Sequence, residues 1–379
     1  MTAPGRILRL DAATALPEDL RGGVVAIGNF DGVHRGHQAV LSAAAEIATR
    51  ERLPLVCLTF EPHPRSVFRP EQPVARLTPA PLKARILDEL GFDAVVEQAF
   101  TREFASETAE SFIEDCLLGA LGARHVVVGY DFRFGARRAG TAETLAAACG
   151  QRTIGVSVIA EFDDEGGAVV SSSRIRSDLS VGDVAGANAL LGYRWIVEGE
   201  IVHGRKLGRT LGYPTANMTL PHDTLLMQGI YAVKLTRADG VAMPGVASFG
   251  RRPTFDGGAA LFETFVFDFD DQLYGETVAV SVFGRLRGEM RFDDAKALVA
   301  QMDRDSQEAR ALLAREVDHR AKNALAVALS VLRLTPRDDA ARFAASQGSG
   351  RRRVVTLATE HKCVLECVRD LASEGFEAV

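Results

Sequence analysis

After the apolar run 24–27, the sequence reads Gly28-Asn29-Phe30-Asp31-Gly32-Val33-His34-Arg35-Gly36-His37, and a helical pattern follows over residues 38–50. The motif therefore lies between a buried strand and a helix. Its glycines let the backbone approach a ligand, and the helix offers free N–H groups to an anion. Two histidines separated by Arg-Gly can both face one phosphate group. A Gly-rich turn with two surface histidines is the alternative, but the ten-residue arrangement favours a phosphate site.

Strand and helix patterns alternate through the first half of the chain. Apolar runs at 53–60, 94–96 and 125–128 are separated by helical patterns at 83–90 and 105–121. Alternation of this kind builds βαβ units and a parallel sheet. Ligands of such sheets bind at the carboxyl ends of the strands, which is where the first motif lies.

Two further segments supply polar groups for such a site. Gly129-Tyr130-Asp131-Phe132-Arg133-Phe134-Gly135 follows a predicted strand, where this architecture places ligand loops. Ser171-Ser172-Ser173-Arg174-Ile175-Arg176 precedes a helical pattern, so its hydroxyls can cap the helix while its arginines bind phosphate oxygens. On its own, the second segment is more typical of a helix cap with solvated arginines.

The character of the sequence changes after about residue 183. Strand-like runs punctuated by glycines follow, and a helical pattern covers residues 293–313. This half is predicted to form an antiparallel sheet or small barrel closed by a helix. Its strand-like runs are 195–202, 229–235, 262–269 and 277–283.

The densest motif of the second half is His203-Gly204-Arg205-Lys206-Leu207-Gly208-Arg209-Thr210-Leu211-Gly212-Tyr213-Pro214-Thr215-Ala216-Asn217. It lacks the spacing of a P-loop. A flap rich in glycine and basic residues can still cover a triphosphate. Thr215 and Asn217, beyond a rigid Pro214, offer the hard oxygen ligands that suit Mg²⁺. A basic hairpin without a ligand fits the bare pattern equally well.

These motifs together resemble a known enzyme family. The His34-Arg35-Gly36-His37 pattern with residues 171–176 is similar to the HxGH nucleotidyltransferases, and more narrowly to the adenylyltransferase half of bacterial bifunctional riboflavin kinase/FAD synthetases. Segments 59–64, 76–78 and 129–135 match that half as well. Residues 212–217 resemble the riboflavin kinase signature, and segments 229–233, 250–255 and 267–269 keep the family's order. Ser173 stands where the superfamily usually has Thr, and it retains the hydroxyl.

The resemblance implies an α/β plus β chain: a Rossmann-like nucleotidyltransferase domain, then a small antiparallel β-barrel with a C-terminal helix. In the first domain, FMN would attack the α-phosphorus of ATP to give FAD and pyrophosphate. His34 and His37 would stabilise the ATP phosphates, and Arg174 and Arg176 would hold the leaving phosphates. The other residues implied to bind nucleotide there are Gly28, Asn29, Phe30, Asp31, Gly36, Asp131, Arg133, Ser171, Ser172 and Ser173.

For the barrel, the resemblance implies phosphorylation of riboflavin by ATP to give FMN. Glu263 would be the general base for the ribityl hydroxyl, and Thr215 and Asn217 would lie at the Mg²⁺–ATP site. Apolar neighbours of Glu263 would raise its pKa, whereas strict strand alternation would instead turn it outward. The flap residues implied to bind nucleotide are Gly204, Lys206, Gly208, Gly212 and Pro214.

The length, charge and composition of the chain limit the functions and locations that it can have. The chain has 379 residues and a net charge of −6, which argues against a nucleic-acid-binding surface. Domains are expected at 1–182 and 183–316, with a tail at 317–379. No apolar run is long enough for a membrane span, and no signal peptide is expected. Five scattered cysteines favour reduced thiols in the cytoplasm. The partners expected are small-molecule substrates, and the oligomeric state stays open.

The tail resembles fragments of two other enzymes. Residues 317–327 resemble the phosphoacceptor helix of one histidine-kinase class, with His319 at the matching position. Residues 354–366 resemble part of a pyridoxal-phosphate cysteine desulfurase, with His361 matching the residue that stacks on the cofactor. The rest of neither enzyme is present, so no cofactor binding and no independent function are expected. Cys363 and Cys367 are more typical of a helical face than of a metal site.

Two alternatives to a two-activity enzyme remain at this point. The chain could retain only one of the two activities, because Ser173 or the tail impairs a site. It could instead be a flavin-binding signalling protein that acts through the helix of His319.

Overall fold

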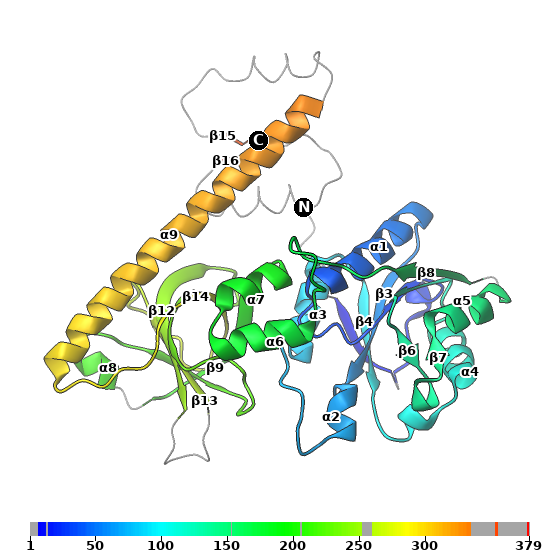
Figure 1. Ribbon diagram of the computed structural model, residues 1–379, viewed down its shortest axis with the longest axis horizontal. Coiled ribbons are helices and arrows are strands. Elements are labelled where there is room, and N and C mark those ends of the chain that lie inside the picture. Colours follow the sequence, from blue (N-terminus) through cyan, green and yellow to red (C-terminus); the bar gives the residue numbers. More distant parts are fainter. Residues whose placement is uncertain are drawn as a thin grey trace. The chain divides into compact units, whose positions relative to one another are not determined.

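The computed structural model describes residues 7–12, 14–152, 154–204, 207–251, 260–334, 353–354 and 377–378. The chain divides into two compact units, Met1–Ala297 and Leu298–Val379. The first unit contains a parallel sheet with its helices and a closed barrel (Figure 1). The second contains most of helix α9 (Ala295–Leu334) and the paired two-residue strands β15 (Arg353–Val354) and β16 (Glu377–Ala378).

The predicted parallel sheet is confirmed and, among the described residues, has six strands. Alternate residues of its central strand belong to different hydrophobic clusters, Val25 and Ile27 to one and Val24 and Ala26 to the other. Both faces of the sheet are therefore covered, as parallel sheets require. In sheet order the strands are β1 (Leu8–Asp11), β4 (Ala94–Ala99), β3 (Leu55–Glu61), β2 (Val24–Ile27), β5 (His125–Gly129) and β8 (Gly155–Ile159).

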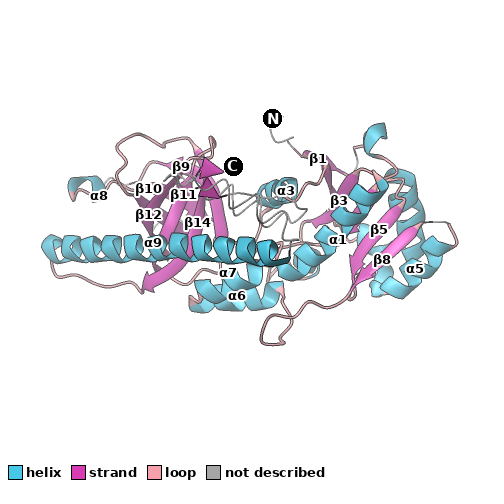
Figure 2. Cartoon of the chain, turned by 90° about the horizontal axis from the view of Figure 1, so that it is seen from above, coloured by secondary structure: helices cyan, strands magenta, loops and turns pink. Residues whose placement is uncertain are grey.

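Helices cover the two faces of this sheet (Figure 2). Leu41 of α1 (Arg35–Glu51) and Leu87 of α3 (Ala80–Glu89) pack on one face, and Leu117 of the π-helix η3 (Phe112–Ala120) and Leu145 of α5 (Ala142–Gly150) pack on the other. The α-helices of the first unit before the barrel are α1 (Arg35–Glu51), α2 (Pro64–Phe68), α3 (Ala80–Glu89), α4 (Ala109–Ser111), α5 (Ala142–Gly150), α6 (Ser172–Val181) and α7 (Val184–Leu191). The described 3₁₀-helices are η1 (Glu18–Leu20), η2 (Phe104–Ser106) and η4 (Ala136–Arg138), whereas η3 (Phe112–Ala120) is a π-helix.

Two helix predictions need correction. The helix predicted from residue 38 begins at Arg35, because His34 caps it, so Gly36 and His37 belong to its first turn. The single helix predicted over 105–121 is divided into η2, α4 and η3. Thr108 causes the break, because its backbone is extended and its hydroxyl accepts a hydrogen bond from the Ser111 N–H to start a new helix.

The strand order positions the site. From β2 the chain continues to β3 on one side, and β5 returns to pair on the other side of β2. Strand order thus reverses at β2, and ligands of open α/β sheets bind at the carboxyl ends beside such a reversal. The loop after β2 and the loop after β5 both open at this edge. The second loop contains the small hairpin of β6 (Arg133–Phe134) and β7 (Gly140–Thr141).

The second half forms a closed barrel of antiparallel strands, as predicted, because β9 pairs with both β14 and β10. Burial alternates along β13, where Phe262 and Thr264 point inward while Glu263 lies on the outer face. Around the barrel the strands are β10 (Ala216–Leu220), β13 (Ala260–Val266), β12 (Ala242–Arg251), β11 (Gly229–Thr236), β14 (Thr277–Arg287) and β9 (Trp195–Val202). The short helix α8 (Leu207–Thr210) precedes β10.

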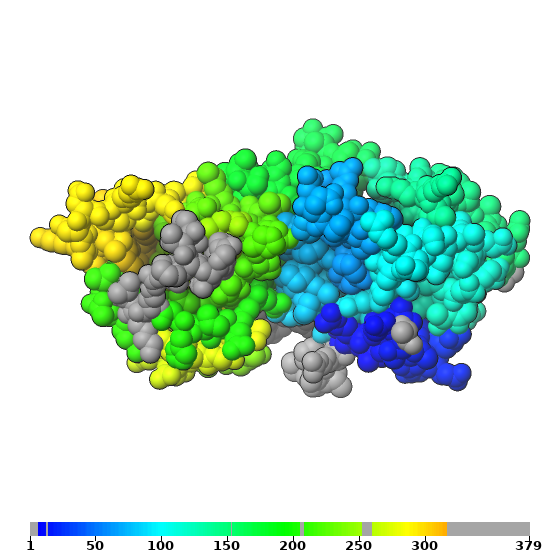
Figure 3. Space-filling model, turned by 90° about the horizontal axis from the view of Figure 1, so that it is seen from below, coloured from blue at the N-terminus to red at the C-terminus, as the bar shows by residue number. Residues whose placement is uncertain are grey.

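The sheet and the barrel of the first unit are in direct contact. The blue surface of the segment that includes α3 adjoins the green surface of the barrel in Figure 3, and Arg85 of α3 forms an ion pair with Glu198 of β9. Gly182 ends α6 and Asp183 caps α7, so residues 182 and 183 lie between these two helices, and the domain boundary expected there stays a prediction.

Helix α9 is longer than its sequence pattern predicted. It continues through residues 314–334, which include the backbone of His319. The predicted end of the helical pattern at residue 313 is therefore wrong, because the helix extends into the segment that resembles a phosphoacceptor helix. The side chain of His319 and residues His361, Cys363 and Cys367 lie outside the described part of the chain.

Candidate active sites

The loop after β2 has an unusual backbone. The φ angles of Phe30, Gly32 and Val33 are 46°, 90° and 36°, all in the left-handed region. A β-branched residue rarely adopts such an angle, so Val33 is held there by its surroundings. Glycine is favoured at position 32 by its φ of 90°, and a Cβ atom there would also lie 2.9 Å from Leu77 Cδ1.

Asp31 lies at the centre of the loop and is 1% exposed. Its carboxylate accepts hydrogen bonds from the N–H groups of Leu77 (3.0 Å) and Thr78 (3.1 Å). It also forms ion pairs with Arg76 (3.3 Å) and with Arg176 of α6. The carboxylate therefore joins the loop to segment 76–78 and to α6, a role that its sequence position alone did not reveal.

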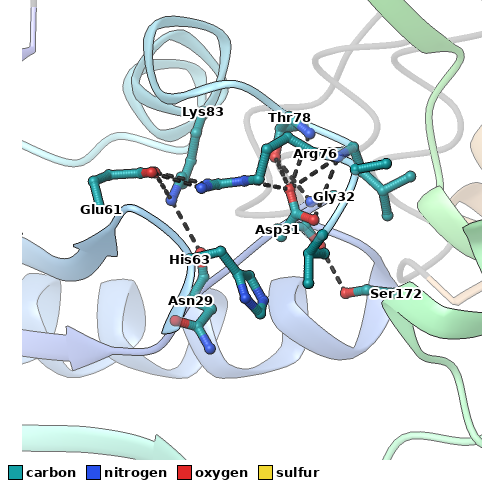
Figure 4. Close-up of polar contacts among 12 residues, drawn as sticks. Asn29, Asp31, Gly32, Glu61, His63, Arg76, Thr78, Lys83 and Ser172 are labelled. Carbon is teal, nitrogen blue, oxygen red and sulfur yellow. Dashed lines mark hydrogen bonds and ion pairs between the residues drawn. The ribbon is translucent and has the colours of Figure 1, made fainter. Parts of the chain in front are cut away.

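A second carboxylate continues this network (Figure 4). Glu61, at the end of β3, accepts two hydrogen bonds from Arg76 (2.6 and 2.7 Å) and one from Lys83 (2.9 Å). Burial alone would raise the pKa of Glu61, but the Arg76 hydrogen bonds and the Lys83 charge outweigh it and lower that pKa. Lys83 is 1% exposed and also donates to the Asn29 carbonyl (3.0 Å) and the Thr59 hydroxyl (2.8 Å).

The two histidines lie against each other at the start of α1. Their rings are stacked with centroids 3.6 Å apart, and His34 Nδ1 accepts a hydrogen bond from the His37 N–H (3.3 Å). Burial lowers the pKa of His34 to about 4 and lowers that of His37 well below its ordinary value. Both imidazoles are therefore neutral near pH 7 and offer hydrogen bonds rather than positive charge.

Two buried polar atoms beside this loop have no partner among the described residues: Asn29 Oδ1 and His37 Nδ1. Buried polar atoms are nearly always hydrogen-bonded, so each of these two positions calls for a partner such as a water or a ligand. Both belong to residues that the sequence assigned to nucleotide binding.

Helix α6 brings the serine–arginine segment to the same place. Ser171 accepts a hydrogen bond from the Arg174 N–H as the cap of α6 (3.4 Å), and Ser172 donates to the Asp31 carbonyl (2.8 Å). Arg176 donates to the Ala75 carbonyl (2.8 Å) in addition to its ion pair with Asp31. Ser173 is exposed in the first turn. The segment is thus a helix cap and also part of the loop's network.

Arg174 turns to the other side of α6. It forms an ion pair with Asp164 (2.6 Å) and donates to the carbonyls of Ala168 (3.0 Å) and Val169 (2.8 Å). It lines a cavity of about 260 Å³ together with Arg35. A second cavity, of about 380 Å³, lies at the carboxyl ends of β1, β3 and β4 and is lined in part by Glu61.

The loop after β5 contributes exposed groups. The side chains of Asp131 and Arg133 are exposed, as a ligand loop requires. Phe134 is buried, and its ring stacks on Phe132 with centroids 5.5 Å apart, so the pair supports the hairpin.

The barrel carries its candidate residues on one outer face. Asn217 on β10 lies opposite Glu263 on β13, and Glu263 lies opposite Ser248 on β12. Glu263 is half-buried, which agrees with the outward-facing alternative from strand alternation. Asn217 is 5% exposed; its amide donates to the Thr215 carbonyl (3.0 Å), and its Oδ1 is another buried atom without a partner among the described residues.

The flap lies next to Asn217. A Cβ atom on Gly204 would come within 2.6 Å of Asn217 Nδ2, so the flap backbone covers this side chain closely. The Tyr213 N–H donates to the Gly208 carbonyl (2.8 Å), and Gly212 has a φ of 86° just before Tyr213-Pro214. Lys206 lies outside the described residues.

Within the described ranges, no group of three or more His, Cys, Asp or Glu side chains is placed to hold a metal ion. None of the described helices has both the length and the apolar composition that a membrane crossing demands. Cys57, Cys116 and Cys149 are free thiols, and burial raises the pKa of Cys57 to about 12.

The sequence did not assign a role to several residues of the first site. Glu61, His63, Arg76 and Thr78 lie in segments noted only for their resemblance. Lys83 was hidden within a helical pattern. The sequence did indicate a role for this lysine. It lies among Leu82, Ala84, Ile86 and Leu87, and a charged residue on the buried face of a helix requires a partner.

Comparisons with known proteins agree with this geometry. Residues 16–174 match the family model of FAD synthetase, and residues 191–313 match that of riboflavin kinase. The "Bifunctional riboflavin kinase/FMN adenylyltransferase" of Escherichia coli (strain K12) is 39% identical over 289 residues, covering 76% of this chain and 92% of the relative. The protein of the same description from Pseudomonas fluorescens is 40% identical over 297 residues, covering 78% and 94%.

A solved structure also covers both halves. The crystal structure of a protein described as a macrolide-efflux protein from Streptococcus pneumoniae has a TM-score of 0.70 and 32% sequence identity. The match covers 80% of this chain and 99% of that chain. The FAD synthetase and riboflavin kinase matches occur in the order that the motifs predicted, and the tail lies outside both. The chain therefore belongs to the family of bifunctional riboflavin kinase/FMN adenylyltransferases.

Proposed function

We propose that the barrel phosphorylates riboflavin with ATP to give FMN, and that the α/β domain joins FMN to the adenylyl group of a second ATP, releasing pyrophosphate and FAD. The observation that carries this proposal is the position of three buried atoms that have no partner among the described residues: Asn29 Oδ1 and His37 Nδ1 at one site and Asn217 Oδ1 at the other. Each lies in a motif of the corresponding half.

In adenylyl transfer, the FMN phosphate attacks the α-phosphorus of ATP and pyrophosphate leaves. No covalent enzyme intermediate is needed, because positioning and electrostatic stabilisation suffice. His34 and His37, neutral and stacked, donate hydrogen bonds to the phosphate oxygens. Arg176 faces the leaving pyrophosphate from α6, and its paired carboxylate Asp31 keeps the guanidinium group oriented. Arg174, which the resemblance assigned to the same phosphates, lies on the other side of α6 in an ion pair with Asp164 and would reach them only by leaving that carboxylate.

Further residues complete the adenylyl-transfer site. Gly28 and Gly36 allow the close approach of the backbone, and the first turn of α1 presents N–H groups to an anion. The remaining residues proposed to contact nucleotide or flavin phosphate are Asn29, Phe30, Asp131, Arg133, Ser171, Ser172 and Ser173, with Asp31 acting through the loop that it holds.

In the barrel, Glu263 accepts the proton of the ribityl hydroxyl as that oxygen attacks the γ-phosphorus of ATP. Its position opposite Asn217 supports this role, because it brings base and nucleotide ligand together on one face. Mg²⁺ fits here, since Asn217 and Thr215 would hold it through a buried amide oxygen that has no partner among the described residues and through a hydroxyl. When bound, the ion neutralises charge on the transferred phosphoryl group.

The flap is proposed to cover the triphosphate. Gly204 packs against Asn217, and Gly208, Gly212 and Pro214 shape the turn that leads to Thr215. Lys206 is proposed to reach the phosphates.

We further propose domain limits of 1–182 and 183–316, a cytoplasmic location, and small-molecule substrates without a nucleic-acid or membrane partner.

Two variants test the independence of the sites. Glu263→Ala should abolish FMN formation from riboflavin and leave conversion of FMN to FAD intact, whereas His37→Ala should do the reverse. Both products are measured by chromatography after incubation with Mg-ATP and the appropriate flavin. The matched controls are Glu200→Ala, on the exposed face of β9, and His125→Ala, at the amino end of β5. Loss of both activities in either variant would refute independent sites, and FMN without FAD from the wild type would refute the second activity.

A further inference from the structure

The loop that carries the histidines is fixed through its carbonyl oxygens. The Asp31 carbonyl accepts from Ser172 (2.8 Å), the Gly32 carbonyl from the Tyr193 hydroxyl (2.8 Å) and the Val33 carbonyl from Gln38 (2.8 Å). The Asn29 carbonyl accepts from Lys83 (3.0 Å). Donors from four different parts of the chain thus converge on one short loop, so its conformation depends on all of them.

This anchoring matters because the loop is strained. Phe30 and Val33 have positive φ angles, which side chains other than glycine rarely adopt. A backbone of this kind persists only where its surroundings determine it. The carbonyl anchors provide that restraint, and the position of the histidines that follow depends on it.

One anchor comes from the other half of the chain. Tyr193 lies between α7 and β9, outside the FAD synthetase match and inside the riboflavin kinase match. Two residues further on, the Trp195 indole donates to the Leu77 carbonyl (3.1 Å), and the Leu77 N–H in turn binds Asp31. Gln38 also donates to the Leu191 carbonyl (2.8 Å), so the contact between the loop and this segment is continuous.

The Tyr193 hydroxyl is well suited to act as a permanent donor. Burial, with a contribution from Asp31, raises the pKa of Tyr193, so the hydroxyl keeps its proton throughout the working range of the enzyme. Gly32 is also held from the other side, because its N–H donates to the Thr78 hydroxyl (2.8 Å). Both peptide groups of Gly32 are thus fixed, one of them by Tyr193.

We propose that Tyr193, from the kinase half of the chain, is a positioning residue for adenylyl transfer, which it supports by holding the Gly32 carbonyl and with it the strained loop of His34 and His37. Tyr193 touches neither reacting group and acts through the loop. The inference rests on the proposed adenylyl transfer in the α/β domain. It makes the second half of the chain a structural part of the first site.

The test is Tyr193→Phe, which removes only the hydroxyl. We expect kcat for FAD formation from FMN to fall about fivefold to tenfold, the effect of one lost hydrogen bond, while KM for FMN changes little. FMN formation from riboflavin should not change. Hydrogen exchange should become faster in peptides that cover residues 29–38. The control is Tyr231→Phe, which removes a buried hydroxyl donating to the Met227 carbonyl inside the barrel and should leave FAD formation from FMN unchanged.

The outcomes separate this inference from the function on which it rests. Wild-type rates of FAD formation and hydrogen exchange in Tyr193→Phe would overturn the positioning role. So would an equal fall in both activities together with a lower melting temperature, because that pattern marks a merely structural residue. If the wild type made no FAD, the proposed adenylyl transfer would fail, and faster exchange over residues 29–38 would still support the anchor itself.

Discussion

His34 is held by two contacts, and the first of them requires a neutral ring. Its Nδ1 accepts the hydrogen bond that caps α1, and its ring stacks on His37. Protonation would place a donor where the cap needs an acceptor and a charge where burial excludes water. These contacts explain at the level of atoms why the folded protein disfavours the imidazolium form.

The stability of the protein should therefore depend on pH through His34. Burial lowers the pKa of His34 to about 4 in the folded protein, against an ordinary value of 6.5, so the neutral ring is favoured on folding. The stability that this preference contributes is fully present above the pKa of the histidine in the unfolded chain, 6.5. It is lost as the pH falls from 6.5 towards the folded-state pKa of about 4. Between pH 7 and pH 5 the loss amounts to about 2 kcal/mol in the free energy of unfolding.

Urea unfolding of His34→Asn at both pH values tests this expectation. Asparagine is a good helix cap but does not titrate, so the variant should lose about 2 kcal/mol less than the wild type. His222→Asn, at an exposed position, should keep the pH dependence of the wild type. An unchanged pH dependence in His34→Asn would contradict the role given to this ring.

At the scale of elements, the start of α6 combines a helix cap with proposed phosphate contacts, and two substitutions separate these roles. Ser171→Ala should lower the free energy of unfolding by about 1 kcal/mol, because the cap is lost. Ser171→Asp keeps a capping oxygen but adds a negative charge beside the position proposed for the leaving pyrophosphate. It should therefore fold with wild-type stability and form FAD more slowly.

Denaturant unfolding and the rate of FAD formation are the two measurements. Asp294→Ala provides a control, because it removes the carboxylate that accepts the Ala297 N–H (2.7 Å) at the start of α9 and should leave FAD formation unchanged. Normal FAD synthesis by Ser171→Asp would show that the phosphates do not approach this end of α6.

Much of the fold could be predicted because its elements bury continuous or alternating apolar runs. Strands β2, β3 and β5 are buried over most of their length, and β13 alternates regularly, so pattern alone located them. The division of 105–121 could not be predicted from periodicity. It depends on the hydroxyl of Thr108, a local hydrogen bond that competes with the continuous helix.

The residues of the candidate sites could be predicted from the sequence only in part. Residues in local motifs, such as His34 and Asn217, were found because one stretch of sequence contains their whole signal. Lys83 and Tyr193 were not assigned, because their roles depend on partners 54 and 161 residues away. Only the folded chain brings those partners together.

At the scale of the whole molecule, the proposed site residues all lie before residue 264, and both family matches end by residue 313. Removal of residues 317–379 should therefore leave FMN and FAD formation unchanged, although it shortens α9. The test compares the shortened chain with the complete chain in two measurements: the rates of both reactions and the thermal unfolding profile. A loss of either activity would show that the tail contributes to that site.

The anchors of the β2 loop also determine when the first site can be completed during synthesis. Its partners Ser172, Arg176 and Tyr193 lie 141, 145 and 161 residues after the loop positions that they hold. A nascent chain that has emerged only as far as α5 contains both histidines but none of these three anchors. The loop therefore obtains all of its anchors only after the first residues of the kinase half have been synthesised, although the motif with the two histidines is among the earliest segments translated.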